Sequence, residues 1–458
     1  MEKLIRFLAV FTAFTVLAFA EPFVPSGIFL TWQHDPTTTM TIDWHSIDGE
    51  DGEIELVKSE AQHQIPITIP VVAKVRTAVL EYRALGAGAW IKATGKSEPY
   101  PFVEERMQGL HRDGYSQPFA PQGRTIHRVE LIGLKPDALY EFRFDAEGRV
   151  DRFRTLPKAL TREVRIAMGG DVGYGVWTER MNRLAASYDP DFAVWGGDLA
   201  YDDGERQRLG RWYGFFDSLT KSFVTKDGRR IPVLLTTGNH ETTGGYYASA
   251  KITALLKGPY VQDDATCRKI APYFFSFFAF PGQPGYNVMD VGNYLSVVLL
   301  DSGHNNPQDG AQAAWLDQTL GARAKVPYVF PVYHVPAFPS LRSQTDPSVV
   351  GGRRNWVPLF EKHHLPVVFE NHDHNYKRTY PIKDGKKDPQ NGTVYLGDGS
   401  WGVLVSGVAE DAAEKRWYLE KAEPLNHFIL ARLTGAGAQF EAISLKGDTI
   451  DRYSVKPR

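Results

Sequence analysis

Five short motifs from Gly170 onward combine acidic or amide side chains with histidine and tyrosine. In chain order they are Gly170-Asp171-Val172-Gly173, Gly197-Asp198-Leu199-Ala200-Tyr201, Gly238-Asn239-His240-Glu241, Tyr333-His334 and Glu370-Asn371-His372-Asp373-His374. Oxygen and imidazole donors together suit iron, zinc or manganese, whereas calcium and magnesium prefer shells of oxygen alone. Seven such donors exceed what one tetrahedral ion needs, but with a bridging carboxylate they suit two ions about 3.5–4 Å apart. Pairs of ions this close are typical of sites that carry out displacement at phosphorus.

The motifs follow apolar runs that the sequence predicts to be β-strands. The predicted strands of this region are Val164–Met168, Phe192–Trp195, Val233–Thr236, Leu295–Leu300, Tyr328–Val332 and Val367–Phe369. Helical patterns lie between them, as in Thr178–Ser187 and Ala311–Leu320, and this alternation predicts an α/β sheet. Ligands of open α/β sheets bind outside the carboxyl ends of the strands, so we expect the motifs to converge. The glycines that precede Asp171, Asp198 and Asn239 let the backbone turn sharply there.

The N-terminal part of the chain shows short strands without helical periodicity. Strand patterns such as Ile28–Trp32 and Met40–Trp44 recur between Pro25 and about Pro157, which predicts a β-sandwich. The segment Leu131–Tyr140 resembles the turn and tyrosine of a fibronectin type III-like module. We therefore predict an all-β domain at residues 21–158 and an α/β domain at residues 159–458, whose sheet the final strand patterns complete.

Composition and charge narrow the classes of function. The chain has 458 residues, of which 43% are hydrophobic and 23% are charged, as in ordinary globular proteins. The formal net charge is −2, so no field of one sign attracts a nucleic acid or an anionic membrane, and neither is an expected stable partner. The single cysteine, Cys267, excludes an intrachain disulfide and a thiolate metal cluster.

The first residues have the pattern of a secretory signal peptide. Lys3 and Arg6 precede an uncharged run from Phe7 to Phe19, and Ala18-Phe19-Ala20 gives a cleavage pattern of small residues. The run is too short to span roughly 30 Å of hydrocarbon as a helix. We predict that residues 1–20 are removed and that the mature protein is exported, periplasmic or secreted, with no transmembrane segment after cleavage.

In their order and spacing, the five motifs resemble those of the calcineurin-like metallophosphoesterase superfamily, and within it the purple acid phosphatases. Many phosphodiesterases and phosphoprotein phosphatases of the superfamily carry a histidine where this chain has Gly173. Tyr201, three residues after Asp198, stands instead where the purple enzymes carry a tyrosine. The resemblance extends to the N-terminal module and implies a layered α/β/β/α sandwich for the second domain.

The resemblance also implies a ligand set and a reaction. It assigns Fe(III) to four residues, namely Asp171, Asp198, Tyr201 and His374. It assigns a divalent Fe, Zn or Mn ion to the bridging Asp198 together with Asn239, His334 and His372. Tyrosinate bound to ferric iron would colour the protein. The implied activity is that of an acid phosphatase, in which metal-bound hydroxide attacks the phosphorus of small phosphate monoesters and the neighbouring His240 hydrogen-bonds the phosphoryl group or protonates the leaving alkoxide.

The residues leave two other functions open, namely a phosphodiesterase or nucleotide hydrolase on the same metal core, and a catalytically dead binding or adhesion protein.

Two departures from the family pattern affect the site. Asn371 replaces an expected glycine, and asparagine tolerates the positive φ of such a turn, while Asp373 is expected to orient a neighbouring histidine. The stretch 335–340 lacks the histidines of larger plant-type enzymes. His304 is a candidate for the mouth of the site, whereas His363 and His364 are expected to be solvated.

Overall fold

The computed structural model describes most of the chain, including all five motifs. The described residues are 25–47, 52–55, 68–71, 77–101, 124–146, 148–205, 208–243, 263–397 and 399–458. The predicted signal peptide, residues 1–20, lies outside them.

The N-terminal part is β-rich and contains two four-stranded antiparallel sheets. One sheet has the order β1 (Ser26–Thr31), β2 (Met40–Ile47), β8 (Arg124–Leu131), β7 (Lys96–Pro99). The other has the order β10 (Asp151–Arg154), β9 (Leu139–Arg143), β5 (Val79–Ala84), β6 (Ile91–Thr94), and a separate pair consists of β3 (Gly52–Glu55) and β4 (Thr68–Val71). Alternate residues of both sheets, among them Trp44 and Phe142, share one core. The backbone N–H of Lys135 donates to the Tyr140 hydroxyl at 2.8 Å, a contact of the tyrosine-corner type.

Two mixed sheets form the rest of the fold. The six-stranded sheet has the order β13 (Val233–Leu235), β12 (Phe192–Trp195), β11 (Val164–Gly169), β23 (His427–Leu433), β24 (Ala438–Ser444), β25 (Thr449–Val455). The seven-stranded sheet has the order β14 (Asn287–Val291), β15 (Leu295–Leu299), β16 (Tyr328–Val332), β17 (Val367–Phe369), β21 (Val394–Gly397), β18 (Tyr376–Thr379), β22 (Leu419–Glu423). The strands that precede the motifs run parallel within each sheet, so their carboxyl ends share an edge.

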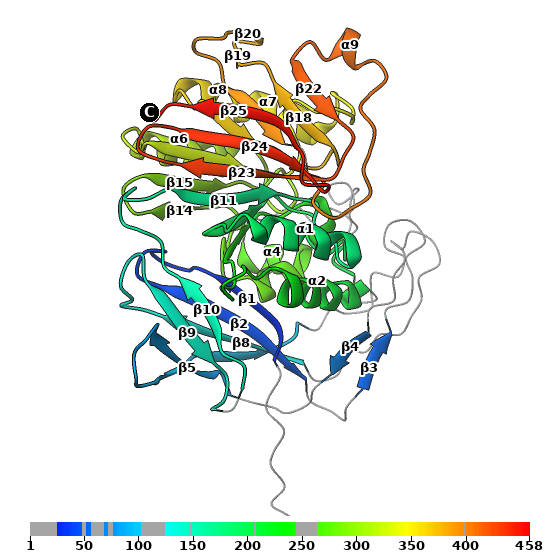
Figure 1. The fold of residues 1–458 in the computed structure, drawn as a ribbon. Coiled ribbons are helices and arrows are strands. Elements are labelled where there is room, and N and C mark those ends of the chain that lie inside the picture. Colours follow the sequence, from blue (N-terminus) through cyan, green and yellow to red (C-terminus); the bar gives the residue numbers. More distant parts are fainter. Residues whose placement is uncertain are drawn as a thin grey trace, which may run out of the picture.

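The two sheets pack face to face between layers of helices (Figure 1). Their inner faces meet in one core that includes Ile166 and Met168 on one side and Val297 and Phe330 on the other. The outer face of the six-stranded sheet is covered by α1 (Val176–Ser187) and α2 (Leu209–Ser222). That of the seven-stranded sheet is covered by α6 (Gly310–Ala322) and α8 (Val357–Lys362), and α7 (Pro347–Asn355) directly precedes α8. The predicted α/β/β/α sandwich is confirmed.

Shorter elements are η3 (Asn239–Glu241), α4 (Asp264–Ile270), α5 (Pro272–Phe277), α9 (Ala412–Lys415), β19 (Ile382–Lys383) and β20 (Lys386–Lys387).

The N-terminal sheets dock on the helical layer through aromatic side chains. The ring of Phe29 in β1 lies 5.5 Å from that of Phe216 in α2, and the ring of Tyr100 lies 5.0 Å from that of Phe277 in α5. The backbone N–H of Ile28 also donates to the Thr220 hydroxyl at 3.0 Å. The N-terminal part therefore supports α2, which covers the strands leading to Asp171 and Asp198.

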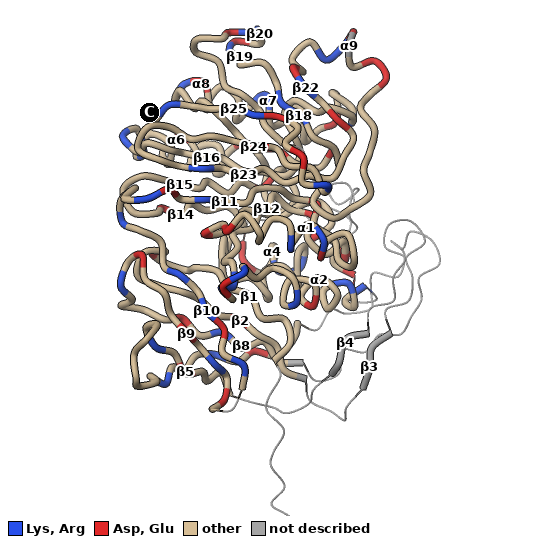
Figure 2. The backbone as a smooth tube through the Cα atoms, viewed as in Figure 1, with Lys and Arg blue, Asp and Glu red and all other residues tan. Residues whose placement is uncertain are grey.

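Charged residues of both signs are scattered over the described chain (Figure 2). This distribution agrees with the formal net charge of −2. Within the described residues, no helix combines the length and the apolar character needed to cross a bilayer.

The carboxyl ends of the two sheets meet around the side chain of Asn371. Its amide nitrogen donates to the Tyr333 carbonyl at 2.9 Å, so the side chain points toward the end of the neighbouring strand β16. A Cβ atom at Gly170 would lie 2.4 Å from Asn371 Oδ1, and one at Gly196 would lie 1.8 Å from its Nδ2. Glycine after β11 and β12 thus makes room for an asparagine that follows β17, and this close packing fixes how the two sheets meet.

This packing predicts that the cost of Gly196→Ala depends on Asn371. We expect Gly196→Ala alone to lower the free energy of unfolding by about 1–3 kcal/mol through overpacking. In an Asn371→Ala background the added methyl group has space, so its cost should be much smaller. Urea unfolding of the four proteins in a chelating buffer gives the coupling energy. Gly435→Ala, where a Cβ would meet nothing within 4 Å, is the matched control. Additive effects of Gly196→Ala and Asn371→Ala would contradict this account.

A buried histidine in the first sheet makes the stability of the protein depend on pH. His127 in β8 is fully buried, its Nε2 lies 2.6 Å from the Ser46 hydroxyl, and its Nδ1 lies 2.8 Å from the Ser97 hydroxyl. Burial lowers the pKa of His127 from 6.5 to about 4. Between these two pH values the unfolded chain binds the proton and the folded chain does not, so stability falls as the pH drops through this window.

We expect His127→Gln to lose less stability than wild type between pH 7 and pH 4.5. The pKa shift of His127 corresponds to a loss of at most about 3 kcal/mol in the free energy of unfolding. The variant lacks the imidazole and should therefore lack this loss. The urea midpoint, followed by tryptophan fluorescence, measures the loss at each pH. His364→Gln is the control, because that side chain is exposed, and it should behave as wild type. An identical pH dependence in His127→Gln would show that the buried imidazole makes no difference.

Candidate metal centre

The seven predicted ligands all lie just beyond strand ends, and all are buried. Asp171 follows β11, and Asp198 and Tyr201 follow β12. Asn239 begins η3, which follows β13. From the second sheet, His334 follows β16, and both His372 and His374 follow β17. The convergence expected from the strand order is therefore present in the structure, with donors contributed by both sheets.

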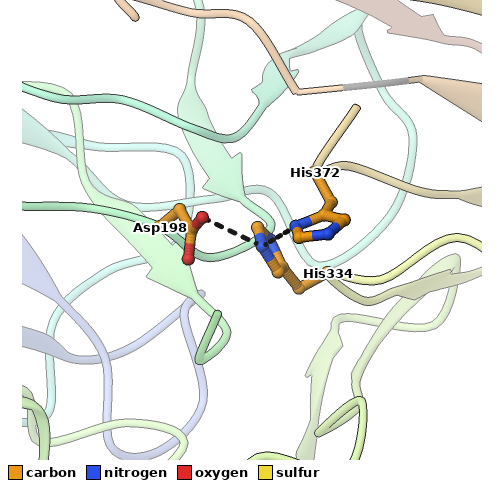
Figure 3. Close-up of side chains that lie close together, drawn as sticks. All are labelled: Asp198, His334 and His372. Carbon is orange, nitrogen blue, oxygen red and sulfur yellow. Dashed lines mark hydrogen bonds and ion pairs between the residues drawn. The ribbon is translucent and has the colours of Figure 1, made fainter. Parts of the chain in front are cut away.

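One group of donors surrounds His334 (Figure 3). Its Nε2 lies 3.1 Å from Asp198 Oδ2, 2.9 Å from His372 Nδ1 and 3.1 Å from Asn239 Oδ1. These atoms belong to the four residues that were assigned to a divalent ion.

A second group surrounds the Tyr201 hydroxyl. The hydroxyl lies 3.2 Å from Asp171 Oδ1 and 3.2 Å from His374 Nε2, and the latter two atoms are 3.0 Å apart. The two candidate groups, Asp198 with His334 and His372, and Asp171 with Asp198 and His374, each place their ligand atoms within 4.8 Å of one another. Asp198 belongs to both. Two carboxylates, a phenol, an amide and three imidazoles arranged in this way fit a pair of ions that share one carboxylate.

Backbone groups orient the side chains of three predicted ligands. His334 Nδ1 lies 2.9 Å from the Gly196 carbonyl and His374 Nδ1 lies 3.0 Å from the Leu404 carbonyl. Each bond leaves the Nε2 atom of that ring turned toward the other donors. The backbone N–H of His372 donates to Asp171 Oδ2 at 2.9 Å. Such contacts fix the direction of a ring before any ion binds.

Five of the seven predicted ligands have left-handed backbone conformations. The φ angles are 54° at Asp171, 53° at Asp198, 61° at Tyr201, 82° at His372 and 51° at His374. Non-glycine residues adopt this region rarely, and strain of this kind concentrates at functional sites. The fold therefore holds these side chains at the site at a conformational cost.

The structure corrects the explanation given for the turns. Positive φ occurs at Gly197 and at His372, and Asn371 is not among the residues with positive φ. Asn371 is instead needed for its packing. Gly238 is needed for close approach, because a Cβ there would lie 2.2 Å from Asp198 Oδ1.

Charge inside the site sets the protonation of its donors. Burial raises the pKa of Asp198, but the neighbouring His334 and His240 outweigh burial and hold it well below its usual range. Burial lowers the pKa of His334, yet Asp198 and Asp171 overcome this and raise it to about 9. Burial and the same two carboxylates raise the pKa of Tyr201 well above its usual value. A strongly charged cation is the species that could displace these protons.

His240 lies beside the donors with an orienting partner of its own. Its Nδ1 is bonded to Asp203, which also pairs with Arg208, and its Nε2 lies 3.9 Å from Asp198 Oδ2. The side chain is 21% exposed, unlike the buried side chains of the predicted ligands. The role of Asp203 was missed, although it stands in the acidic pair directly after Tyr201.

Glu241 was also missed as a contributor to the site. Its carboxylate accepts the backbone N–H groups of Asp198 at 2.8 Å, Leu199 at 2.6 Å and Gly238 at 2.7 Å. It thus ties the turn that carries Asp198 to the turn that carries Asn239. The sequence shows Glu241 directly after His240, but the backbone groups that it binds follow from the fold.

The contacts of Asp373 and His363 differ from those expected from the sequence. Asp373 does not orient a neighbouring histidine. Its carboxylate accepts from the Ser340 hydroxyl at 3.1 Å and from the Leu341 N–H at 2.7 Å, and so fixes the loop after His334. His363 is not solvated as expected, because its side chain is only 14% exposed and pairs with Asp317 at 2.6 Å.

Two further histidines and Gly399 differ in their burial and in their distance from the site. His364 is exposed, as predicted. His304 is buried, with its ring 5.8 Å from that of His334. A Cβ at Gly399 would lie 1.6 Å from Asp171 Oδ2, so only glycine leaves room there for the Asp171 carboxylate.

Comparison with known proteins supports the arrangement of domains. Residues 25–155 match the purple acid phosphatase N-terminal domain, and residues 164–376 match the calcineurin-like phosphoesterase family. Purple acid phosphatase 21 of Arabidopsis thaliana is 26% identical over 308 residues, which cover 66% of this chain and 64% of that protein. Purple acid phosphatase 22 of the same plant is 26% identical over 278 residues, which cover 60% of this chain and 58% of that protein. The chain thus spans less than two thirds of the length of these relatives.

Solved structures agree at the level of the fold. The purple acid phosphatase PPD1 from yellow lupin (Lupinus luteus) seeds superimposes with a TM-score of 0.68 at 16% identity, over 94% of this chain and 74% of that one. A structure described as PhoD superimposes with a TM-score of 0.60 at 12% identity, over 94% of this chain and 89% of that one. With both family models matched in order and the donors gathered at the strand ends, the chain is a purple acid phosphatase-like protein of the calcineurin-like phosphoesterase superfamily.

Proposed function

We propose that this protein is an exported binuclear-metal phosphatase that hydrolyses phosphate monoesters. The observation that carries the proposal is the position of Asp198, whose carboxylate belongs to both groups of donors. The names of the matched relatives, which are purple acid phosphatases, support the same reaction. Export is supported by the sequence pattern of residues 1–20.

The proposed ion set is Fe(III) together with a divalent iron, zinc or manganese ion. Asp171, Tyr201 and His374 would hold the ferric ion, because a phenolate is a hard anionic donor. Asn239, His334 and His372 would hold the divalent ion, with Asp198 between the two. When bound, such ions neutralise phosphate oxygens and lower the pKa of a water molecule, so that a nucleophile is available in mildly acidic solution.

His240 is the proposed catalytic residue among the protein's own side chains. Asp203 holds its Nδ1, so the ring presents Nε2 toward Asp198 and the donors around it. From this position Nε2 can donate a hydrogen bond to the phosphoryl group or a proton to the leaving alkoxide. The buried ligands have no such freedom, because their donor atoms are directed at one another.

A monoester suits this site better than a diester. The phosphoryl group of a monoester has three non-bridging oxygens, one more than a diester, and charge spreads over all three during transfer. The imidazole of His240 can donate to one of these oxygens, and the ions that the two groups of donors would hold would supply positive charge for the others.

The proposal is tested by metal analysis and substrate preference together. Purified protein should contain at least one iron per chain, show a visible absorption band and hydrolyse aryl phosphate monoesters faster than the matching diesters. A clear preference for the diester would favour a phosphodiesterase on the same metal core. Less than one iron per chain, with neither the absorption band nor hydrolysis, would favour a binding protein.

Tyr201→Phe should abolish the colour while the fold is retained. The substitution removes the phenolate that gives rise to the charge-transfer band but keeps the buried ring. Absorption spectra and circular dichroism of the metal-loaded proteins measure colour and fold. Tyr395→Phe is the matched control, since Tyr395 is also fully buried and its hydroxyl has no hydrogen-bond partner among the described residues. A coloured Tyr201→Phe variant would show that Tyr201 is not an iron ligand.

A further inference from the structure

A tightly held loop follows β15 at the edge where the donors meet. The Asp301 carboxylate accepts the backbone N–H groups of His304 at 2.8 Å, Asn305 at 2.9 Å and Asn306 at 2.7 Å. The Ser302 hydroxyl oxygen accepts the backbone N–H of His334 at 3.1 Å. The position of His304 is thereby fixed relative to a predicted metal ligand on the neighbouring strand.

The imidazole of His304 is buried at the site without a partner for one of its nitrogens. The residue is 8% exposed, and its ring lies edge-on to that of His334 with centroids 5.8 Å apart. Its Nε2 has no hydrogen-bond partner among the residues that the structure describes. A buried polar atom left in this way is costly, and such atoms in native proteins call for an explanation.

Metal ligation does not provide that explanation. His304 belongs to neither of the two groups whose ligand atoms lie within 4.8 Å of one another. Packing alone does not provide it either, because an apolar ring of the same shape would fill the space without the unpaired nitrogen. The remaining partner for Nε2 is a molecule that enters the site.

We propose that His304 contacts the substrate, with its Nε2 donating a hydrogen bond to a phosphoryl oxygen on the His334 side of the site. The inference rests on the proposed function and adds a second imidazole to His240, which comes from the other sheet. The loop that follows His334, residues 335–340, contains no histidine. The imidazole on this side therefore comes from the neighbouring loop.

The two amide substitutions of His304 test this contact. The amide of glutamine reaches the place of an imidazole Nε2, whereas that of asparagine is shorter and reaches only the place of Nδ1. We expect His304→Asn to weaken the binding of inorganic phosphate and to lower kcat/KM for an aryl phosphate, each by about 10- to 100-fold. His304→Gln should recover a substantial part of both.

The measurements use metal-loaded full-length protein. Calorimetry gives the Kd of inorganic phosphate, steady-state kinetics give kcat/KM, and elemental analysis gives the metal content of each variant. His364→Asn is the control, because His364 is exposed and lies outside the site, and it should match wild type in all three measurements.

The outcomes separate this inference from the proposed function. Retained metals with weakened phosphate binding in His304→Asn, partly recovered in His304→Gln, support the contact. Unchanged phosphate binding in His304→Asn overturns it, and so does loss of metal, which would indicate a role in the metal site itself. If wild type binds phosphate but hydrolyses no ester, the proposed function fails while the phosphate comparison still decides the role of His304.

Discussion

The carboxylate of Asp198 is the constraint on which the rest of the site depends. It lies within reach of donors from both sheets, and Glu241 holds the backbone of its turn through the N–H groups of Asp198 and Leu199. A carboxylate can be shared in this way only if the ends of two sheets approach closely. That approach requires glycine at positions 170, 196 and 238, where a Cβ would collide with Asn371 or with Asp198 itself.

The same constraint explains the unusual backbone of the site. Asp171, Asp198 and His372 follow three different strands and all have left-handed φ angles. At each of them the chain turns away from its strand and over the edge of the sheet. The strain is held in place by surrounding structure, including the buried ion pair between Glu370 and Lys377 at 2.6 Å. Hydrogen bonds and close packing among the described residues therefore position the predicted ligands.

Local patterns predicted the elements well, because apolar runs bounded by glycine and aspartate are local signals. The strand expected at Phe192–Trp195 has those bounds, and the helix expected at Thr178–Ser187 begins only two residues earlier, at Val176. The predicted ligands also gather as expected. What the sequence could not show were contacts between distant segments, such as Asn371 against Gly170 and Gly196. Asp373 likewise binds a loop more than 30 residues away, which no pattern around it indicates.

The protonation of the site indicates how the protein can fold before it binds metal. Asp198 and His334 form an ion pair at 3.1 Å, and the Tyr201 hydroxyl donates to Asp171 at 3.2 Å, so the donors satisfy one another's charge and hydrogen bonding. An incoming cation must displace the protons of His334 and Tyr201, whose pKa values are both raised. Metal binding should therefore release protons and strengthen as the pH rises. For the proposed phosphatase, the attraction for phosphate would come from the bound ions, so a formal net charge of −2 is compatible with the reaction.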